Sequence, residues 1–127
     1  MRKRDGFTLI SVIIAIVLLS VGVMALANSM YYIARVTRTE TQRTQALELA
    51  SQYIEDLRAR DPWGISSEAL ANIDSTGAVN VNGAFTRQLT VTNEGIQLLR
   101  LVLVVKARAG TRPPSITLTT LMFKVAT

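Results

Sequence analysis

The chain has 127 residues, 49% of them hydrophobic, and its 14 Lys and Arg outnumber its 9 Asp and Glu. It contains neither His nor Cys, which excludes Ser-His-Asp and Cys-His triads, disulfide bonds and nearly all zinc sites. Gly-rich phosphate loops are absent and the carboxylates are scattered, so we expect neither an enzyme nor a cofactor. The length leaves room for one small domain beside a membrane segment.

The N-terminus combines a short basic head with a long apolar run. Arg2, Lys3 and Arg4 lie within the first five residues, and no residue from Phe7 to Ala27 is charged. About 20 consecutive apolar residues are enough to cross the hydrocarbon core of a bilayer as a helix. The sequence therefore predicts that the chain enters a membrane.

Three interpretations fit this start. An ordinary signal peptide would be cleaved after the A-x-A site Ala25-Leu26-Ala27, although the apolar run is longer than the usual h-region of about 7–15 residues. A plain signal anchor, which stays uncleaved, also fits the hydropathy. The third interpretation depends on the junction at which Gly6 is followed by Phe7, Thr8, Leu9 and Ile10.

This junction resembles the class III leader of type IV pilins and pseudopilins. The resemblance implies that residues 1–6 are a leader, that a prepilin peptidase cuts between Gly6 and Phe7, and that the same enzyme methylates the new N-terminus at Phe7. It also implies that residues 7–34 span the inner membrane with the N-terminus in the cytoplasm, and that they later pack against other pilins. The residues to which it gives a part in this assembly helix are Thr8, Leu9, Ile10, Ser11 and Gly22.

One residue departs from the family pattern. The family usually carries Glu at the fifth mature position, where it is taken to pair with the N-terminal amine of a neighbouring subunit, and this chain has Ser11 there. Ser11 cannot form an ion pair, and a carboxylate inside an apolar helix normally persists because it has a partner. The departure favours a minor pilin or minor pseudopilin in an initiating or tip complex. Gly22 is expected to allow close helix packing or local unwinding in a filament.

The helix is expected to continue as an amphipathic segment over residues 35–61. No Pro occurs before Pro62, which biases Asp61 out of the helical region. After a polar stretch at 36–45, apolar residues recur at helical spacing. We expect this stripe to pack against a sheet, with contacts from Leu47, Ala50, Ile54 and Leu57.

The remaining residues predict a loop at 62–84, with a short helical turn at 67–70, and an antiparallel sheet at 85–127. Strands are expected at about 85–92, 97–109 and 116–125, with turns at 93–95 and 110–114 and a weaker strand at Val79 and Val81. The second strand should present one apolar face, made of Leu99, Leu101, Leu103, Val105 and Ala107. The predicted fold class is therefore α+β, a long N-terminal helix packed on a small antiparallel β-meander in a periplasmic domain at 35–127.

Three functions remain open at this point. The first is a minor pilin or pseudopilin of a type IV pilus or type II secretion pseudopilus, with other pilins, the prepilin peptidase and the inner membrane as partners. The second is a competence pseudopilin that binds DNA through Arg87, Arg100, Arg108 and Arg112, although the basic residues are scattered and nucleic acid is the weaker expectation. The third is an anchored periplasmic domain without a filament role.

Overall fold

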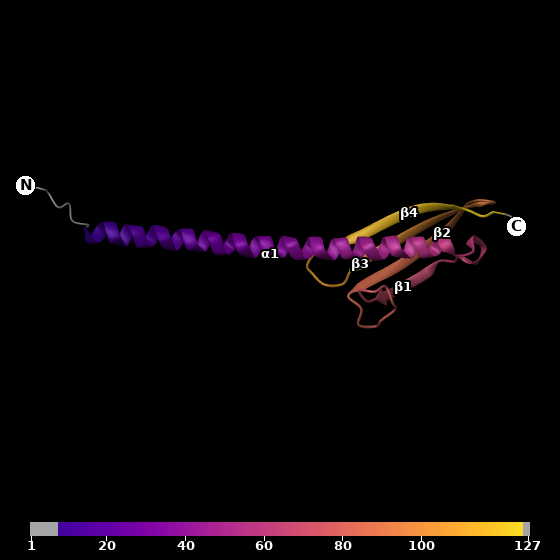
Figure 1. The fold of residues 1–127 in the computed structure, drawn as a ribbon, viewed down its shortest axis with the longest axis horizontal. Coiled ribbons are helices and arrows are strands. Elements are labelled where there is room, and N and C mark those ends of the chain that lie inside the picture. Colours follow the sequence, from indigo (N-terminus) through magenta and orange to yellow (C-terminus); the bar gives the residue numbers. More distant parts are fainter. Residues whose placement is uncertain (1–7, 126–127) are drawn as a thin grey trace, which may run out of the picture. The chain divides into compact units, whose positions relative to one another are not determined.

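The computed structural model describes residues 8–125 and contains one long helix and four strands (Figure 1). The predicted fold class, a long N-terminal helix and an antiparallel sheet, is confirmed. In chain order the elements are α1 (Leu9–Ala59), a short 3₁₀ helix η1 (Pro62–Gly64), β1 (Glu68–Ile73), β2 (Phe85–Gly95), β3 (Leu98–Ala107) and β4 (Ser115–Phe123).

The chain forms two compact units that divide between Arg38 and Thr39, inside α1. We call residues 8–38 the apolar segment and residues 39–125 the sheet domain. α1 ends at Ala59, and Asp61 then caps η1 by accepting a hydrogen bond from the backbone N–H of Trp63 at 3.1 Å. The end of the helix follows from Pro62, which has no N–H to donate and fits the first position of η1.

The four strands form one antiparallel sheet in the order β1-β2-β3-β4. β2 and β3 pair along almost their whole length, and β4 pairs with β3 without any irregularity of register. The turn between β2 and β3 lies at Ile96 and Gln97. The predicted turn at 93–95 instead forms the end of β2, because a register shift between Asn93 and Gly95 accommodates the extra residue within the strand.

Two predictions for the segment before β2 were wrong. The segment at 67–70 was expected as a helical turn inside a loop, but its last three residues begin β1, which pairs with β2. The weaker strand expected at 79 and 81 is absent from the described structure, where Val79 forms only an isolated bridge with Ile73. Glu, Ala and Leu favour a helix locally, but the free edge of β2 offers backbone hydrogen bonds that outweigh this preference.

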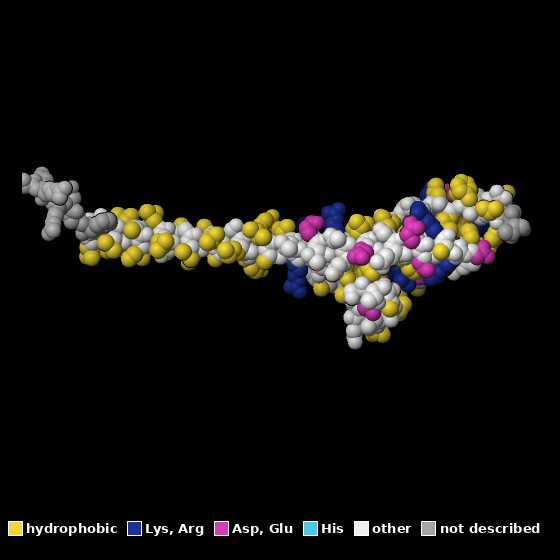
Figure 2. Space-filling model, in the orientation of Figure 1, with side chains coloured by type: hydrophobic (Ala, Val, Ile, Leu, Met, Phe, Trp, Pro, Cys, Tyr) yellow, Lys and Arg dark blue, Asp and Glu magenta, His cyan; other side chains and the backbone are white. Residues whose placement is uncertain are grey.

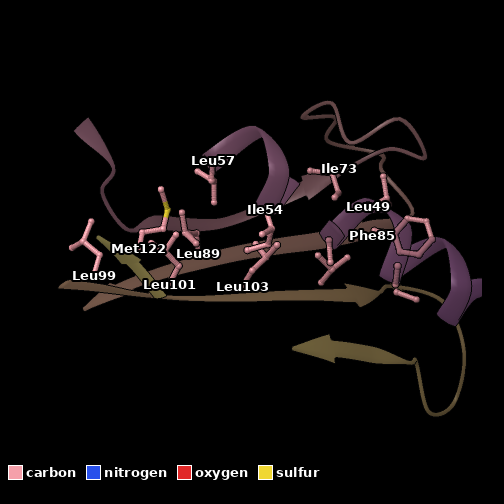
Figure 3. Close-up of a cluster of buried hydrophobic side chains, with 14 residues drawn as sticks. Leu49, Ile54, Leu57, Ile73, Phe85, Leu89, Leu99, Leu101, Leu103 and Met122 are labelled. Atoms are coloured by element: carbon pink, nitrogen blue, oxygen red, sulfur yellow. The ribbon is translucent and has the colours of Figure 1, made fainter. Parts of the chain in front are cut away.

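The hydrophobic core lies between the last turns of α1 and one face of the sheet (Figure 3). β3 supplies the face that its alternation predicts, and all five of the residues expected there are buried. From α1 the buried residues are Ala46, Leu49, Ala50, Ile54 and Leu57. Complete burial of a large apolar side chain is worth about 1.5–3 kcal/mol, so this cluster is the main source of stability in a domain without disulfides.

Leu47 is the helix residue for which the predicted packing was wrong. Its side chain is 46% exposed, whereas Ala46 and Ala50 are fully buried. At 3.6 residues per turn, the buried stripe of the helix follows positions 46, 49, 50, 53, 54 and 57. Leu47 lies at the border of this stripe, so that its side chain faces away from the centre of the sheet.

Candidate functional site

The apolar segment is exposed on all sides within the chain itself. Its most apolar 18-residue window has a mean hydropathy of 3.0 and is 0% buried. Leu9 is 77% exposed, Leu18 67% and Leu26 58%, and Figure 2 shows hydrophobic side chains along the visible face of this part of α1. A helix that is apolar all round requires either lipid or other proteins to cover it. By length and composition, this helix can cross a membrane.

Three hydroxyl groups of the apolar segment find hydrogen-bond partners within the same segment. The hydroxyl of Ser20 donates to the carbonyl oxygen of Ile16 at 2.8 Å. The hydroxyls of Thr8 and Ser11 form a hydrogen bond with each other, also at 2.8 Å. A bilayer core contains no water to satisfy free polar groups, so these internal bonds make the hydroxyls compatible with an apolar environment.

Thr8 and Ser11 have the positions of a helix cap. The backbone N–H of Val12 donates to the carbonyl oxygen of Thr8 at 3.3 Å, which makes Thr8 the N-cap and Ser11 the third helical residue. In a capping box the third helical residue is Glu or Gln, whose side chain reaches back to the cap. Here the neutral Ser11 hydroxyl bonds to the Thr8 side chain instead. The Thr-x-x-Ser spacing at the start of the apolar run is the signal of this cap in the sequence.

Of the other residues predicted for leader cleavage and assembly, the structure describes Gly22 but not Gly6 or Phe7. The junction residues Gly6 and Phe7 lie outside the described part of the chain. At Gly22 the helix continues without interruption. Apart from the helix's own backbone, no atom of the described residues lies within 4 Å of the place where a Cβ of Gly22 would stand. Gly22 therefore has space around it for another helix, and its part in packing or unwinding stays a prediction.

Arg87, one of the four arginines proposed for DNA binding, is enclosed in the sheet domain. Its guanidinium carbon lies 3.8 Å from the centre of the Tyr53 ring, and its Nη1 donates to the carbonyl oxygen of Gly77 at 3.3 Å. Its Nη2 lies 3.6 Å from a carboxylate oxygen of Glu68. The buried Nε has no hydrogen-bond partner among the described residues. The aromatic face and the carboxylate together offset the cost of burying this charge.

Tyr53 links the helix to β1 in the same cluster. Its hydroxyl donates a hydrogen bond to the Glu68 carboxylate. Burial, and secondarily this hydrogen bond, raises the pKa of Tyr53 to about 12. Tyr53 and Arg87 line an open pocket of about 330 Å³, together with Asp56 and Arg60. Because Arg87 is paired with Glu68 and Arg60 with Asp56, the charges at this pocket are balanced, and the cluster fastens α1 to the sheet.

Two other arginines proposed for DNA binding also contact the sheet domain, at separate places. Arg108 donates to the carbonyl oxygens of Val81 and Gly83, at 3.1 and 2.9 Å. Arg100 forms an ion pair with Glu94 at 3.2 Å. Their register also separates these side chains, because Arg87 points to the core face of the sheet and Arg100 to the opposite face. The structure therefore does not gather these arginines into one basic surface.

Comparison with known families returns a match to the prokaryotic N-terminal methylation motif over residues 1–27. Neither the search of curated proteins nor that of solved structures found a significant match. The matched residues include the basic head, the Gly6–Phe7 junction and most of the charge-free run. The predicted class III prepilin leader is therefore confirmed, and together with the long apolar helix it supports a type IV pilin-like protein.

Proposed function

We propose that the chain is a minor, non-catalytic subunit of a type IV pilus or of a type II secretion pseudopilus. It is held in the inner membrane by residues 7–34, with the N-terminus in the cytoplasm and the sheet domain in the periplasm. A prepilin peptidase removes residues 1–6 and methylates Phe7. The observation that carries this proposal is the methylation motif, which leads directly into a helix that is apolar and exposed on every side.

The apolar segment serves in two environments under this proposal. It is covered first by lipid and later by the helices of other pilins in the filament. Lipid tails are as apolar as Leu, so helix association in this setting depends on close packing and interhelical hydrogen bonds rather than on burial from water. The open surface at Gly22 is suited to such close packing. Contacts of the sheet domain must supply the remaining selectivity.

Ser11 supports a place at an end of the filament. A carboxylate at this position would attract a neighbour's N-terminal amine strongly in a dry interior. The Ser11 hydroxyl is neutral and already bonded to Thr8, so it adds no such attraction. We expect the chain to be sub-stoichiometric beside other pilins. Quantitative mass spectrometry of sheared filaments would contradict a minor role by finding this chain as the most abundant subunit.

Leader processing tests the proposal most directly. Co-expression with a prepilin peptidase should remove residues 1–6 and leave a methylated Phe7, which intact-mass spectrometry detects. Gly6→Arg should block cleavage while membrane insertion persists, and Gly6→Ala is the matched control, since a small residue remains at the junction. A mature N-terminus at Asn28 would instead establish an ordinary signal peptide and refute the pilin-like function.

A further inference from the structure

The segment at 74–84, which connects β1 to β2 (Figure 1), contains the reactive pair Asn82-Gly83. Of the five Asn residues in the chain, only Asn82 is followed by Gly. Because Gly has no side chain to obstruct the approach, the backbone nitrogen of Gly83 can attack the side-chain amide carbon of Asn82. A cyclic succinimide forms, and the amide nitrogen leaves as ammonia together with the N–H proton of Gly83. Water then opens the ring and leaves Asp or isoaspartate at position 82.

The packing of the segment on β1 requires the glycine of this pair. A Cβ on Gly83 would lie only 2.1 Å from the carbonyl oxygen of Ile73, so a larger residue, which would slow the reaction, does not fit. Gly83 is buried, whereas Asn82 beside it is exposed. Close packing at the end of β1 therefore places a chemically labile pair at the surface of the sheet domain.

The folded backbone holds the pair in a geometry that does not react. The N–H of Gly83 donates to the carbonyl oxygen of Asn80 at 2.9 Å, which closes a β-turn with Asn82 at its third position. No described non-glycine residue has a positive φ, so this turn is of type I, and ψ at its third position is about 0°. Ring closure instead requires the Gly83 nitrogen to eclipse the Asn82 Cβ. The Cα–C bond of Asn82 must therefore rotate, and this rotation breaks the hydrogen bond to Asn80.

Side chains from outside the turn hold it closed. Nη1 of Arg108 donates to the carbonyl oxygens of Val81 and Gly83, at 3.1 and 2.9 Å. Nδ2 of Asn72 in β1 also donates to the carbonyl oxygen of Val81, at 3.1 Å. Hydrogen bonds from an ionised donor are stronger than those from a neutral one. Arg108 is therefore the main restraint on the opening of this turn.

We propose that Asn82 is a deamidation site whose rate is set by the opening of the turn at 80–83. In the closed turn the Gly83 nitrogen does not reach the side-chain amide carbon. In the open turn the pair reacts as it does in an unfolded chain. Local openings of this kind require less free energy than global unfolding. Modified chains therefore accumulate without loss of the core.

Both products change how the segment lies on β1. Each adds a carboxylate at position 82, and isoaspartate also lengthens the main chain by a carbon atom next to Gly83. The contact of Gly83 with Ile73 has no space for an altered path, so isoaspartate should release the segment from the edge of β1. All of these residues belong to the sheet domain, so the site is independent of the proposed function.

The test follows deamidation of the full-length chain in lipid nanodiscs at mildly alkaline pH. Incubation in heavy-oxygen water marks each event, because the oxygen that enters at ring opening comes from the solvent. Liquid chromatography with mass spectrometry separates the peptides that carry Asn, Asp or isoaspartate at position 82. The native chain should react more slowly than the same chain in urea by about tenfold or more. Equal rates in the two states would overturn the proposal.

Asn80 is an internal control within the same turn. It is followed by Val81, whose branched side chain obstructs attack by the backbone nitrogen. In urea Asn80 should therefore react much more slowly than Asn82. Equal rates for the two residues in urea would refute the role given to Gly83.

Amide hydrogen exchange at Gly83 measures the same opening by a second method. Its N–H exchanges when the bond to Asn80 is broken, which is also the condition for ring closure. Folding should slow exchange at Gly83 and deamidation at Asn82 by factors that agree within about twofold. Deamidation that is much faster than this opening permits would show that the closed turn reacts, and would overturn the proposal.

Arg108→Ala and Arg100→Ala form a matched pair of variants. Arg108 holds the turn, whereas Arg100 pairs with Glu94 at the other end of β3. Arg108→Ala should accelerate both exchange at Gly83 and deamidation at Asn82 by about tenfold, and Arg100→Ala should change neither. Equal deamidation rates in the two variants would overturn the proposal. If Arg108→Ala does not fold, the comparison of the native and urea-unfolded parent chain decides the matter.

Discussion

The two parts of α1 carry similar apolar side chains with opposite exposure. In the apolar segment Leu26 is 58% exposed, whereas Leu57 in the sheet domain is 1% exposed. Apolar residues surround the first part of the helix on all sides and form a single stripe on the second. The helical backbone is the same in both parts, so the difference comes from what covers the side chains. The second part is covered by its own sheet, and the first requires a cover from outside the chain.

This contrast locates the sources of stability. The buried cluster that joins α1 to β2, β3 and β4 belongs to the sheet domain, so substitutions there should change the unfolding of that domain. Substitutions in the apolar segment should instead change membrane insertion or association with other chains.

The largest effect is expected in the middle of β3. Leu103 is 0% exposed, and Leu103→Ala should cost about 2–5 kcal/mol of stability and lower the Tm of the sheet domain by about 10 °C or more. Thermal melts of the full chain in nanodiscs, followed by near-ultraviolet circular dichroism, measure this. Leu26→Ala should leave the Tm almost unchanged. Equal shifts in Tm for the two variants would contradict the conclusion that the sheet domain is stabilised by its own core and not by the apolar segment.

A second comparison lies within the amphipathic part of α1. Ile54 is 6% exposed and Leu47 46%. Ile54→Ala should destabilise the sheet domain by about 2–4 kcal/mol, and Leu47→Ala by less than about 1 kcal/mol, because its side chain is only partly removed from water. Chemical denaturation of both variants gives the two values. A larger loss for Leu47→Ala would show that the helix packs on the sheet through a different stripe.

Membrane insertion should respond to the apolar segment alone. Leu18→Arg places a charge near the middle of the apolar run, at a cost of about 2.5–3.5 kcal/mol for insertion. Gln45→Arg, in the polar part of α1, should not affect insertion. Carbonate extraction of membranes separates inserted from peripheral protein and so compares the variants. Unchanged insertion of Leu18→Arg would mean that this segment does not span the bilayer.

The smallest effect concerns Tyr53 at alkaline pH. Its pKa is raised from 10.0 to about 12 in the folded chain, so the unfolded chain loses the phenol proton first as the pH rises. The stability that this shift contributes is complete below pH 10 and is lost between pH 10 and about 12. Denaturation across this range should show a steeper loss for the parent chain than for Tyr53→Phe, which has no phenol to ionise. If the stability of the two chains falls in parallel as the pH rises, the raised pKa of Tyr53 is contradicted.

The sequence by itself determined the features that depend on neighbours along the chain. The charge-free run after Gly6, the leader junction and the end of α1 before Pro62 each follow from local composition. The alternation in β3 determined which of its faces is buried, because strand side chains alternate whatever the partner. An apolar helix long enough to cross a membrane, and an antiparallel sheet, could therefore be predicted without knowledge of tertiary contacts.

The tertiary structure alone decided the features that depend on pairing between distant residues. The segment at 68–73 became a strand because β2 offers it a partner, although its composition favours a helix. The sheet's position over α1 decided that Ala46 is buried and Leu47 exposed. Arg108 donates hydrogen bonds to the carbonyl oxygens of Val81 and Gly83, which the sequence does not predict. Only the folded sheet determines that β1 and β4 lie at its edges. Local propensity carries no information about such contacts, since their backbone and side-chain partners come from residues far apart in sequence.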